Sequence, residues 1–258
     1  MTKRSPTTAV RGGRSGARRR ECVLRLPAWC VAALVVLLAP LVATVQAAGT
    51  ADARAALAAG RYAEAYDAAS AVDTAASQVL AARAAADYAV YGSLDAEEHD
   101  AWLQRARDAA KRATELDPND AEAYVQLARA EGEGARNADV FANVRLVGEL
   151  KDLFDRALRL QPDNADALAG LAMWNLELSQ RGVGWLFGAS RDRVVPLLEK
   201  AVAAAPGQIN LRVEYAVALR ALGEPSAADA RLREALALPA VTAADRYEQK
   251  RAAALLQP

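Results

Sequence analysis

The chain has 258 residues and a formal net charge of zero, because 32 Lys and Arg balance 32 Asp and Glu. A balanced charge argues against a polycationic nucleic-acid-binding protein and against a chain with a long acidic tail. Alanine supplies 65 residues and aromatic residues only 5%, a composition that favours helices over a β-sandwich or barrel.

The basic and acidic residues are divided unevenly along the chain. Residues 1–47 carry eight basic side chains and one acidic side chain, a net charge of +7. Residues 48–258 hold the remaining 24 basic and 31 acidic side chains, a net charge of −7. The second segment therefore has the wrong sign for binding nucleic acid, which requires a basic surface.

The first segment is typical of an export signal. An apolar run from Leu26 to Val45 follows the basic residues, and small side chains at Val45 and Ala47 suit cleavage after Ala47. The alternative is an uncleaved signal anchor, with residues 26–45 in the inner membrane. Both alternatives predict a periplasmic location for residues 48–258, with membrane contact only through an uncleaved N-terminal segment.

Both cysteines, Cys22 and Cys30, lie in the first segment. Cleavage would leave a chain with no disulfide and no Cys-based metal site. Neither cysteine ends the apolar run as a lipobox cysteine would, so the sequence does not predict a lipoprotein.

Residues 48–258 contain internal repeats. Two series of alanines, listed below, run through the chain in the same phase, which predicts tandem structural units. The first series has steps of 44, 44 and 34 residues and the second has steps of 44: Ala113, Ala157, Ala201 and Ala235; Ala84, Ala128, Ala172 and Ala216.

The last unit shows the expected content of each repeat. Helices are predicted over Ile209–Leu222 and Ser226–Leu238, joined by Gly223-Glu224-Pro225. Ala216, Ala228 and Ala235 occupy positions 8, 20 and 27 of a 34-residue frame. This pattern resembles the tetratricopeptide repeat (TPR), and the resemblance covers about residues 50–239. It implies a right-handed α-solenoid.

The expected organisation of residues 48–258 is a single TPR-like domain. Helix pairs are predicted over residues 50–74, 75–118, 119–162, 163–206 and 207–239, followed by a capping helix over 241–256. The three 44-residue units exceed the TPR period by ten residues. We place these extra residues between the two helices of each unit, at Tyr88–Glu98, Gly132–Ala142 and Leu176–Leu186.

Two surfaces are candidates for binding. Equivalent inserts should emerge along one edge, and Phe141, Trp185 and Phe187 would lie there; alternatively, these aromatics pack insert against insert. The TPR resemblance also implies a concave face lined by the first helix of each pair, which would form a groove for a helix, peptide or small ligand or be filled by the C-terminal helix. The predicted concave residues are Val125, Arg129, Met173, Leu176, Val213, Val217 and Arg220.

No catalytic residue, metal site or cofactor is predicted. The single histidine, His99, stands in an acidic stretch without a clear set of convergent partners. The carboxylate pairs Asp117/Asp120 and Asp163/Asp166 lie next to the repeat prolines, where they are expected to cap helices.

The sequence therefore predicts an exported, non-catalytic scaffold that mediates protein–protein interaction in the bacterial cell envelope. A second resemblance is to the periplasmic T-component family of TRAP transporters, through the lengthened units and the apolar insert Gly182–Gly188. It implies a ligand-binding accessory subunit, oligomerisation and an organic-acid or apolar ligand. The lipobox usual in that family is missing.

Overall fold

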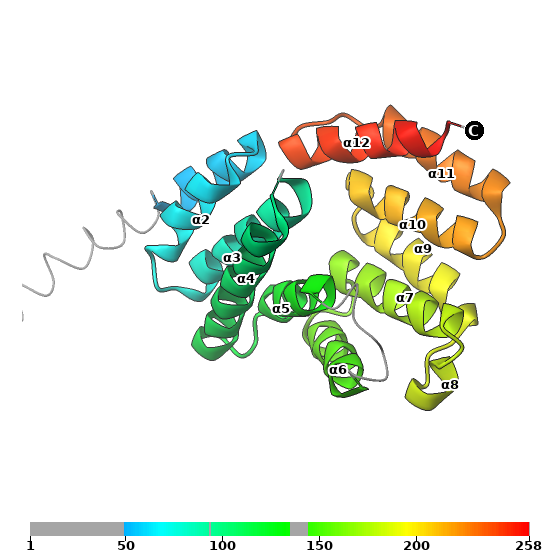
Figure 1. Cartoon of the computed structure of the whole chain (residues 1–258), viewed down its shortest axis with the longest axis horizontal. Helices are drawn as coiled ribbons and strands as arrows, with labels where there is room; N and C mark the ends of the chain where they lie inside the picture. Colours follow the sequence, from blue (N-terminus) through cyan, green and yellow to red (C-terminus); the bar gives the residue numbers. More distant parts are fainter. Residues whose placement is uncertain (1–48, 93, 135–143, 258) are drawn as a thin grey trace, which may run out of the picture. The chain divides into compact units, whose positions relative to one another are not determined.

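The computed structural model describes residues 49–92, 94–134 and 144–257, all within the compact unit Thr44–Pro258 (Figure 1). These residues form α-helices and one 3₁₀ helix, with no strand among them. The predicted all-α solenoid is confirmed. Across the described ranges, no helix is both long and apolar enough to cross a membrane. The predicted export signal, residues 1–47, lies outside the described residues.

The helices follow one another as antiparallel pairs. The first pair consists of a helix over residues 49–59 and α2. The remaining bounds, in chain order, are α2 (Tyr62–Ser70), α3 (Ala75–Tyr91), α4 (Ala96–Leu116), α5 (Ala121–Gly134), α6 (Val144–Leu160), α7 (Ala165–Gln180), α8 (Gly184–Phe187), the 3₁₀ helix η1 (Arg191–Arg193), α9 (Val194–Ala204), α10 (Ile209–Ala221), α11 (Pro225–Ala237) and α12 (Ala243–Leu255).

Local sequence signals set several helix ends. Thr74, Asp95 and Asn164 precede α3, α4 and α7, and each side chain accepts a hydrogen bond from a backbone N–H in the first turn. These bonds satisfy donors that a helix leaves without a partner at its N-terminus. Gly223, with a φ of 87°, follows α10, and Pro225 begins α11. Glycine tolerates this positive φ, and proline suits the first turn of a helix.

The alanines of the two repeat series lie at the helix–helix contacts. All eight are 1% exposed or less. They lie on α3, α5, α7 and α10, and on their partners α4, α6, α9 and α11, so each pair contains one alanine from each series. The small side chain lets two backbones approach closely, and interiors are packed too densely to leave that space empty.

The ten extra residues of each long unit do not all form inserts. In the first long unit they extend the helices themselves, because α3 has 17 residues and α4 has 21. Only residues 92–95 separate the two helices, so the predicted insert Tyr88–Glu98 is wrong for this unit. In the third long unit the extra residues form α8 and η1. Most of the second predicted insert lies outside the described residues.

The C-terminal helix α12 contacts helices from both halves of the repeat array. It packs against α10 and α11 and also contacts α3. The rings of Tyr91 and Tyr247 are 4.8 Å apart between centroids, and the Tyr91 hydroxyl donates to Glu248 Oε1 at 3.2 Å. Ala243 lies so close to Gly60 that a Cβ on Gly60 would approach it to 2.7 Å. The capping helix therefore joins the last repeat to the first helix pairs.

Candidate functional site

A network of charged side chains connects α3, α5 and α12. Asp87 of α3 is buried and forms an ion pair with Arg129 of α5 at 2.6 Å. Burial lowers the pKa of Arg129, but Asp87 and Tyr91 outweigh this effect and raise that pKa above its ordinary value. Arg129 therefore stays charged, and its charge is neutralised within the fold.

The network continues into α12 through Glu248. This carboxylate is buried, accepts from Tyr91, and lies 3.3 Å from Arg251. Arg251 also pairs with Glu214 of α10 at 2.7 Å. Burial raises the pKa of Glu248, and Glu214 adds to this, while Arg251 and Tyr91 oppose it. These contacts hold α12 against α3 and α10. The TPR frame did not predict the following residues of the network as site residues: Asp87, Glu214, Glu248 and Arg251.

Six aromatic side chains form a continuous chain beside this network. Successive ring centroids are 4.8 to 6.2 Å apart, distances at which aromatic rings attract one another. The rings therefore cover one another. In spatial order they are Tyr247, Tyr91, Tyr62, Tyr88, Trp102 and Tyr66.

The residues predicted to line the concave face have different environments. Val125, Leu176 and Val213 are buried in the apolar core, where their side chains contact neighbouring helices. Met173 and Val217 are half-buried. Arg220 is exposed and pairs with Asp229 of α11 at 2.9 Å. Three of these six positions therefore contribute to the packed core.

The residues of the predicted inserts also differ in their exposure. Trp185 on α8 is 79% exposed and its neighbour Leu186 is 51% exposed. Phe187 is half-buried and packs with Val147 and Trp174. Phe141 lies outside the described residues. The structure thus leaves one exposed apolar surface on this insert, formed by Trp185 and Leu186.

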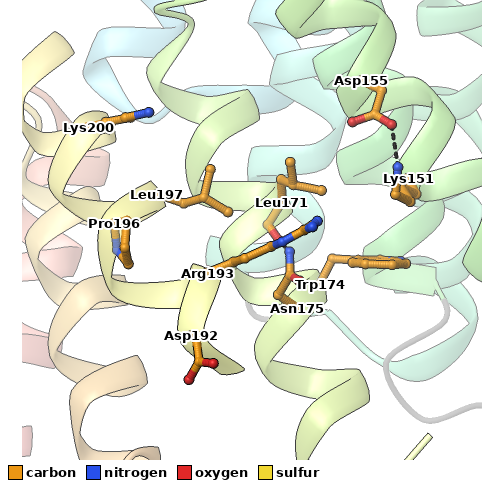
Figure 2. A pocket seen from close by; sticks show the side chains of 10 residues that line it. All are labelled: Lys151, Asp155, Leu171, Trp174, Asn175, Asp192, Arg193, Pro196, Leu197 and Lys200. Carbon is orange, nitrogen blue, oxygen red and sulfur yellow. Dashed lines mark hydrogen bonds and ion pairs between the residues drawn. The ribbon is translucent and has the colours of Figure 1, made fainter. Parts of the chain in front are cut away.

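A surface pocket of about 300 Å³ lies between α6, α7, η1 and α9 (Figure 2). Its lining combines an apolar floor with polar and charged side chains. The apolar residues are Leu171, Trp174, Pro196 and Leu197; the others are Lys151, Asp155, Asn175, Asp192, Arg193 and Lys200.

Buried hydrogen bonds fix the floor of the pocket. Trp174 Nε1 donates to the carbonyl oxygen of Val147 on α6 at 3.0 Å, which sets the ring orientation. Asn175 donates to the carbonyl of Leu171 and accepts from the backbone N–H of Ser190, both at 2.8 Å. Asn175 therefore ties α7 to the start of η1. A polar residue within the apolar sequence of α7 is a signal that could have drawn attention to this position.

The charges around the pocket are only partly neutralised. Lys151 and Asp155 form an ion pair at 2.5 Å. Arg193 and Lys200 are exposed, and within the described ranges no carboxylate lies at ion-pair distance from either. Asp192 points away from the other lining side chains in Figure 2. The pocket therefore presents two unpaired cations beside an apolar floor.

Comparison with protein families identifies the chain. Residues 50–258 match the family described as regulator of microtubule dynamics protein 1-3. The chain belongs to this family. The match covers every described helix from α2 to α12, including the pocket and the charged network. No curated protein matches the chain.

Solved structures with a similar fold are TPR proteins. TTC0263, described as a thermophilic TPR protein in Thermus thermophilus, aligns with a TM-score of 0.62 and 18% identity over 82% of this chain and 98% of that chain. MamA aligns with a TM-score of 0.41 and 17% identity over 83% and 97%. YrrB, described as a TPR protein with an unusual peptide-binding site, aligns with a TM-score of 0.34 and 20% identity over 67% and 84%. The first of these supports the TPR fold. The comparisons give no support to the resemblance to the T-component family.

The sequence predicts no metal site, and its single histidine is His99. Its Nδ1 lies 3.4 Å from an oxygen of the adjacent Asp100. Within the part of the chain that the structure describes, no three His, Cys, Asp or Glu side chains converge as metal ligands would.

Proposed function

We propose that this family member is an exported scaffold without catalytic activity that binds a protein partner in the cell envelope. The observation that carries the proposal is the tandem array of TPR-like helix pairs, α2 to α11. In such arrays each unit contacts only its neighbours, and the stacked units form an extended surface. This surface is suited to binding other chains. The basic, then apolar, N-terminal sequence supports export.

The exposed apolar surface of α8 is the contact that we propose for this partner. Trp185 and Leu186 are largely exposed on a four-residue helix. A large exposed tryptophan is costly to leave in water, and tryptophan is enriched among the residues that dominate binding energy at interfaces. The test is in-cell crosslinking of the tagged full chain, after fractionation of the cells into cytosol, periplasm and membrane.

We expect the chain in an envelope fraction, with a crosslinked protein that Trp185→Ala removes. Val241→Ala is the matched control, because Val241 is also an exposed apolar residue (75%) but precedes α12. Recovery of the chain only from the cytosol would contradict export. Equal crosslinking by wild type and Trp185→Ala would contradict the assignment of α8.

The family description supports a second candidate, in which the partner is a microtubule. Co-sedimentation of the purified full chain with polymerised tubulin tests this candidate directly. Saturable binding to microtubules, together with recovery from the cytosol, would favour it over an envelope partner. Sedimentation of the chain equally without tubulin would count against it.

A further inference from the structure

The rings of Tyr91 on α3 and Tyr247 on α12 form the closest tyrosine pair among the described residues. Their centroids are 4.8 Å apart and the ring planes are inclined by 54°. The other tyrosine pairs in contact, Tyr62 with Tyr88 and Tyr62 with Tyr91, have centroids 6.2 and 6.1 Å apart. Only a small shift therefore separates Tyr91 and Tyr247 from the position of two directly bonded rings.

The two rings differ in their access to solvent. Tyr247 is 43% exposed, so a dissolved oxidant can reach it. Tyr91 is half-buried, and the neighbouring ring of Tyr62 and a hydrogen bond to Glu248 hold it in place. The pair thus combines one accessible phenol with one fixed phenol.

Glu248 supplies Tyr91 with a proton acceptor. The Tyr91 hydroxyl donates to Glu248 Oε1 at 3.2 Å, and this carboxylate is buried. Burial raises the pKa of Tyr91, so the phenol keeps its proton in the resting protein. One-electron oxidation makes a phenol strongly acidic, and the proton then passes to a nearby base. A carboxylate already hydrogen-bonded to the hydroxyl is correctly placed to receive it.

No thiol competes for oxidation in the repeat domain. Both cysteines, Cys22 and Cys30, precede residue 48. Thiolates are among the most readily oxidised groups in proteins. A segment without them leaves one-electron oxidation to its tyrosine and tryptophan side chains, of which Tyr247 is exposed and next to a second phenol.

We propose that Tyr91 and Tyr247 form an oxidative cross-linking site, at which a one-electron oxidant of the peroxidase type joins the two rings as dityrosine. Each phenol loses one electron and one proton; Tyr91 passes its proton to Glu248 and Tyr247 passes its proton to water. The two phenoxyl radicals form a carbon–carbon bond between their ortho carbons, and the ortho hydrogens move to the oxygens to restore the phenols. One hydrogen peroxide accepts the two electrons and two protons and becomes two waters.

The new bond would fasten the C-terminal helix to the first long unit. Because α12 packs against α10 and α11 and also contacts α3, the cross-link would close the repeat array covalently. Such a bond limits the freedom of the unfolded chain in the way that a disulfide does. The modification goes beyond the scaffold function and does not depend on it.

Oxidation of the purified full chain with a haem peroxidase and hydrogen peroxide tests the proposal. Trypsin releases Tyr247 in the peptide Tyr247–Lys250, which contains no other tyrosine. We expect mass spectrometry to find this peptide joined to the one that carries Tyr91, with the loss of two hydrogens, in the monomer fraction of a sizing column. Chain oxidised in urea should lose this preference, because folding brings the two rings together.

Variants separate the two phenols from the proton acceptor. Tyr91→Phe and Tyr247→Phe should each abolish the linked peptide, whereas Tyr124→Phe is the matched control, because Tyr124 is also half-buried but its ring lies beside Arg156. Glu248→Gln keeps an oxygen that can accept from Tyr91 but removes the base, so cross-linking should slow by about tenfold or more.

Three outcomes would overturn the proposal. The first is the absence of the linked peptide under conditions that convert free tyrosine to dityrosine. The second is a mixture of links among all tyrosines, or links only between separate chains, in the folded protein. The third is cross-linking of Glu248→Gln at the rate of wild type, which would reject the transfer of the Tyr91 proton to Glu248.

Discussion

At the scale of single residues, Gly170 is the position where packing is most demanding. It lies in α7, and a Cβ there would approach ring atoms of Phe154 to 2.3 and 2.4 Å. Phe154 is itself buried among the side chains of α5, α6 and α7, so its ring has little space to move. We expect Gly170→Ala to lower the free energy of unfolding by about 1–3 kcal/mol through overpacking, despite the better helix propensity of alanine. Urea unfolding measures this change.

Gly148 of α6 is the matched control for this substitution. A Cβ at Gly148 would meet no atom within 4 Å, so Gly148→Ala changes helix propensity without a steric cost. We expect it to raise the free energy of unfolding by roughly 0.5–1 kcal/mol. Equal stabilisation by both substitutions would show that the Phe154 ring moves aside freely, contrary to the packing argument.

At the scale of secondary structure, α12 depends on its N-terminal cap. The Thr242 hydroxyl accepts from the backbone N–H of Asp245 at 3.1 Å, and the Asp245 carboxylate accepts from the N–H of Thr242 at 2.8 Å. Thr242→Ala removes one of these reciprocal bonds and is expected to cost about 1 kcal/mol. Hydrogen exchange measured by mass spectrometry should show faster exchange across α12.

Glu224→Ala provides the comparison for the Thr242 substitution. Glu224 precedes α11 at the equivalent position, but its side chain makes no capping hydrogen bond. We therefore expect little change in exchange across α11. Similar acceleration in both helices would mean that the reciprocal bonds at Thr242 do not stabilise α12.

The helices and their contacts could be predicted largely from local sequence, because repeat spacing and capping residues act within one or two units. The spacing of alanines such as Ala84 and Ala128 marked the helix–helix contacts correctly. The path of the extra residues could not be derived in the same way. The repeat length gives the number of extra residues but not their secondary structure. Around Tyr88 and Glu98 the sequence forms helix, so these residues extend α3 and α4 where a loop was expected.

At the scale of the whole repeat domain, the candidate sites depend on contacts between units that no single repeat encodes. The frame indicated Arg129, but its partner Asp87 comes from the preceding unit. Tyr91 and Glu248 are 157 residues apart and meet only because α12 reaches α3. The pocket beside Trp174 likewise requires α6 of one unit and α9 of the next.

The contact between α12 and α3 should make stability depend on pH. Burial raises the folded-state pKa of Glu248 above its ordinary value of 4.5. Between 4.5 and the raised value, the folded chain binds more protons at this site than the unfolded chain. The contribution of Glu248 to the free energy of unfolding therefore falls as pH rises through this window, and is greatest at the acidic end. The groups that face the carboxylate are Tyr91, Arg251 and Glu214.

Two variants isolate this contribution in urea unfolding measured from about pH 4 to about pH 8. Glu248→Gln removes the titrating group but keeps an oxygen that can accept from Tyr91, so its free energy of unfolding should fall less steeply than that of wild type. Tyr91→Phe removes a hydrogen bond that lowers the pKa of Glu248, so the fall should extend to higher pH. Burial also raises the pKa of Glu122, and some slope therefore remains in both variants. A Glu248→Gln profile parallel to that of wild type would mean that this carboxylate is solvated in the folded chain and that α12 does not close over α3.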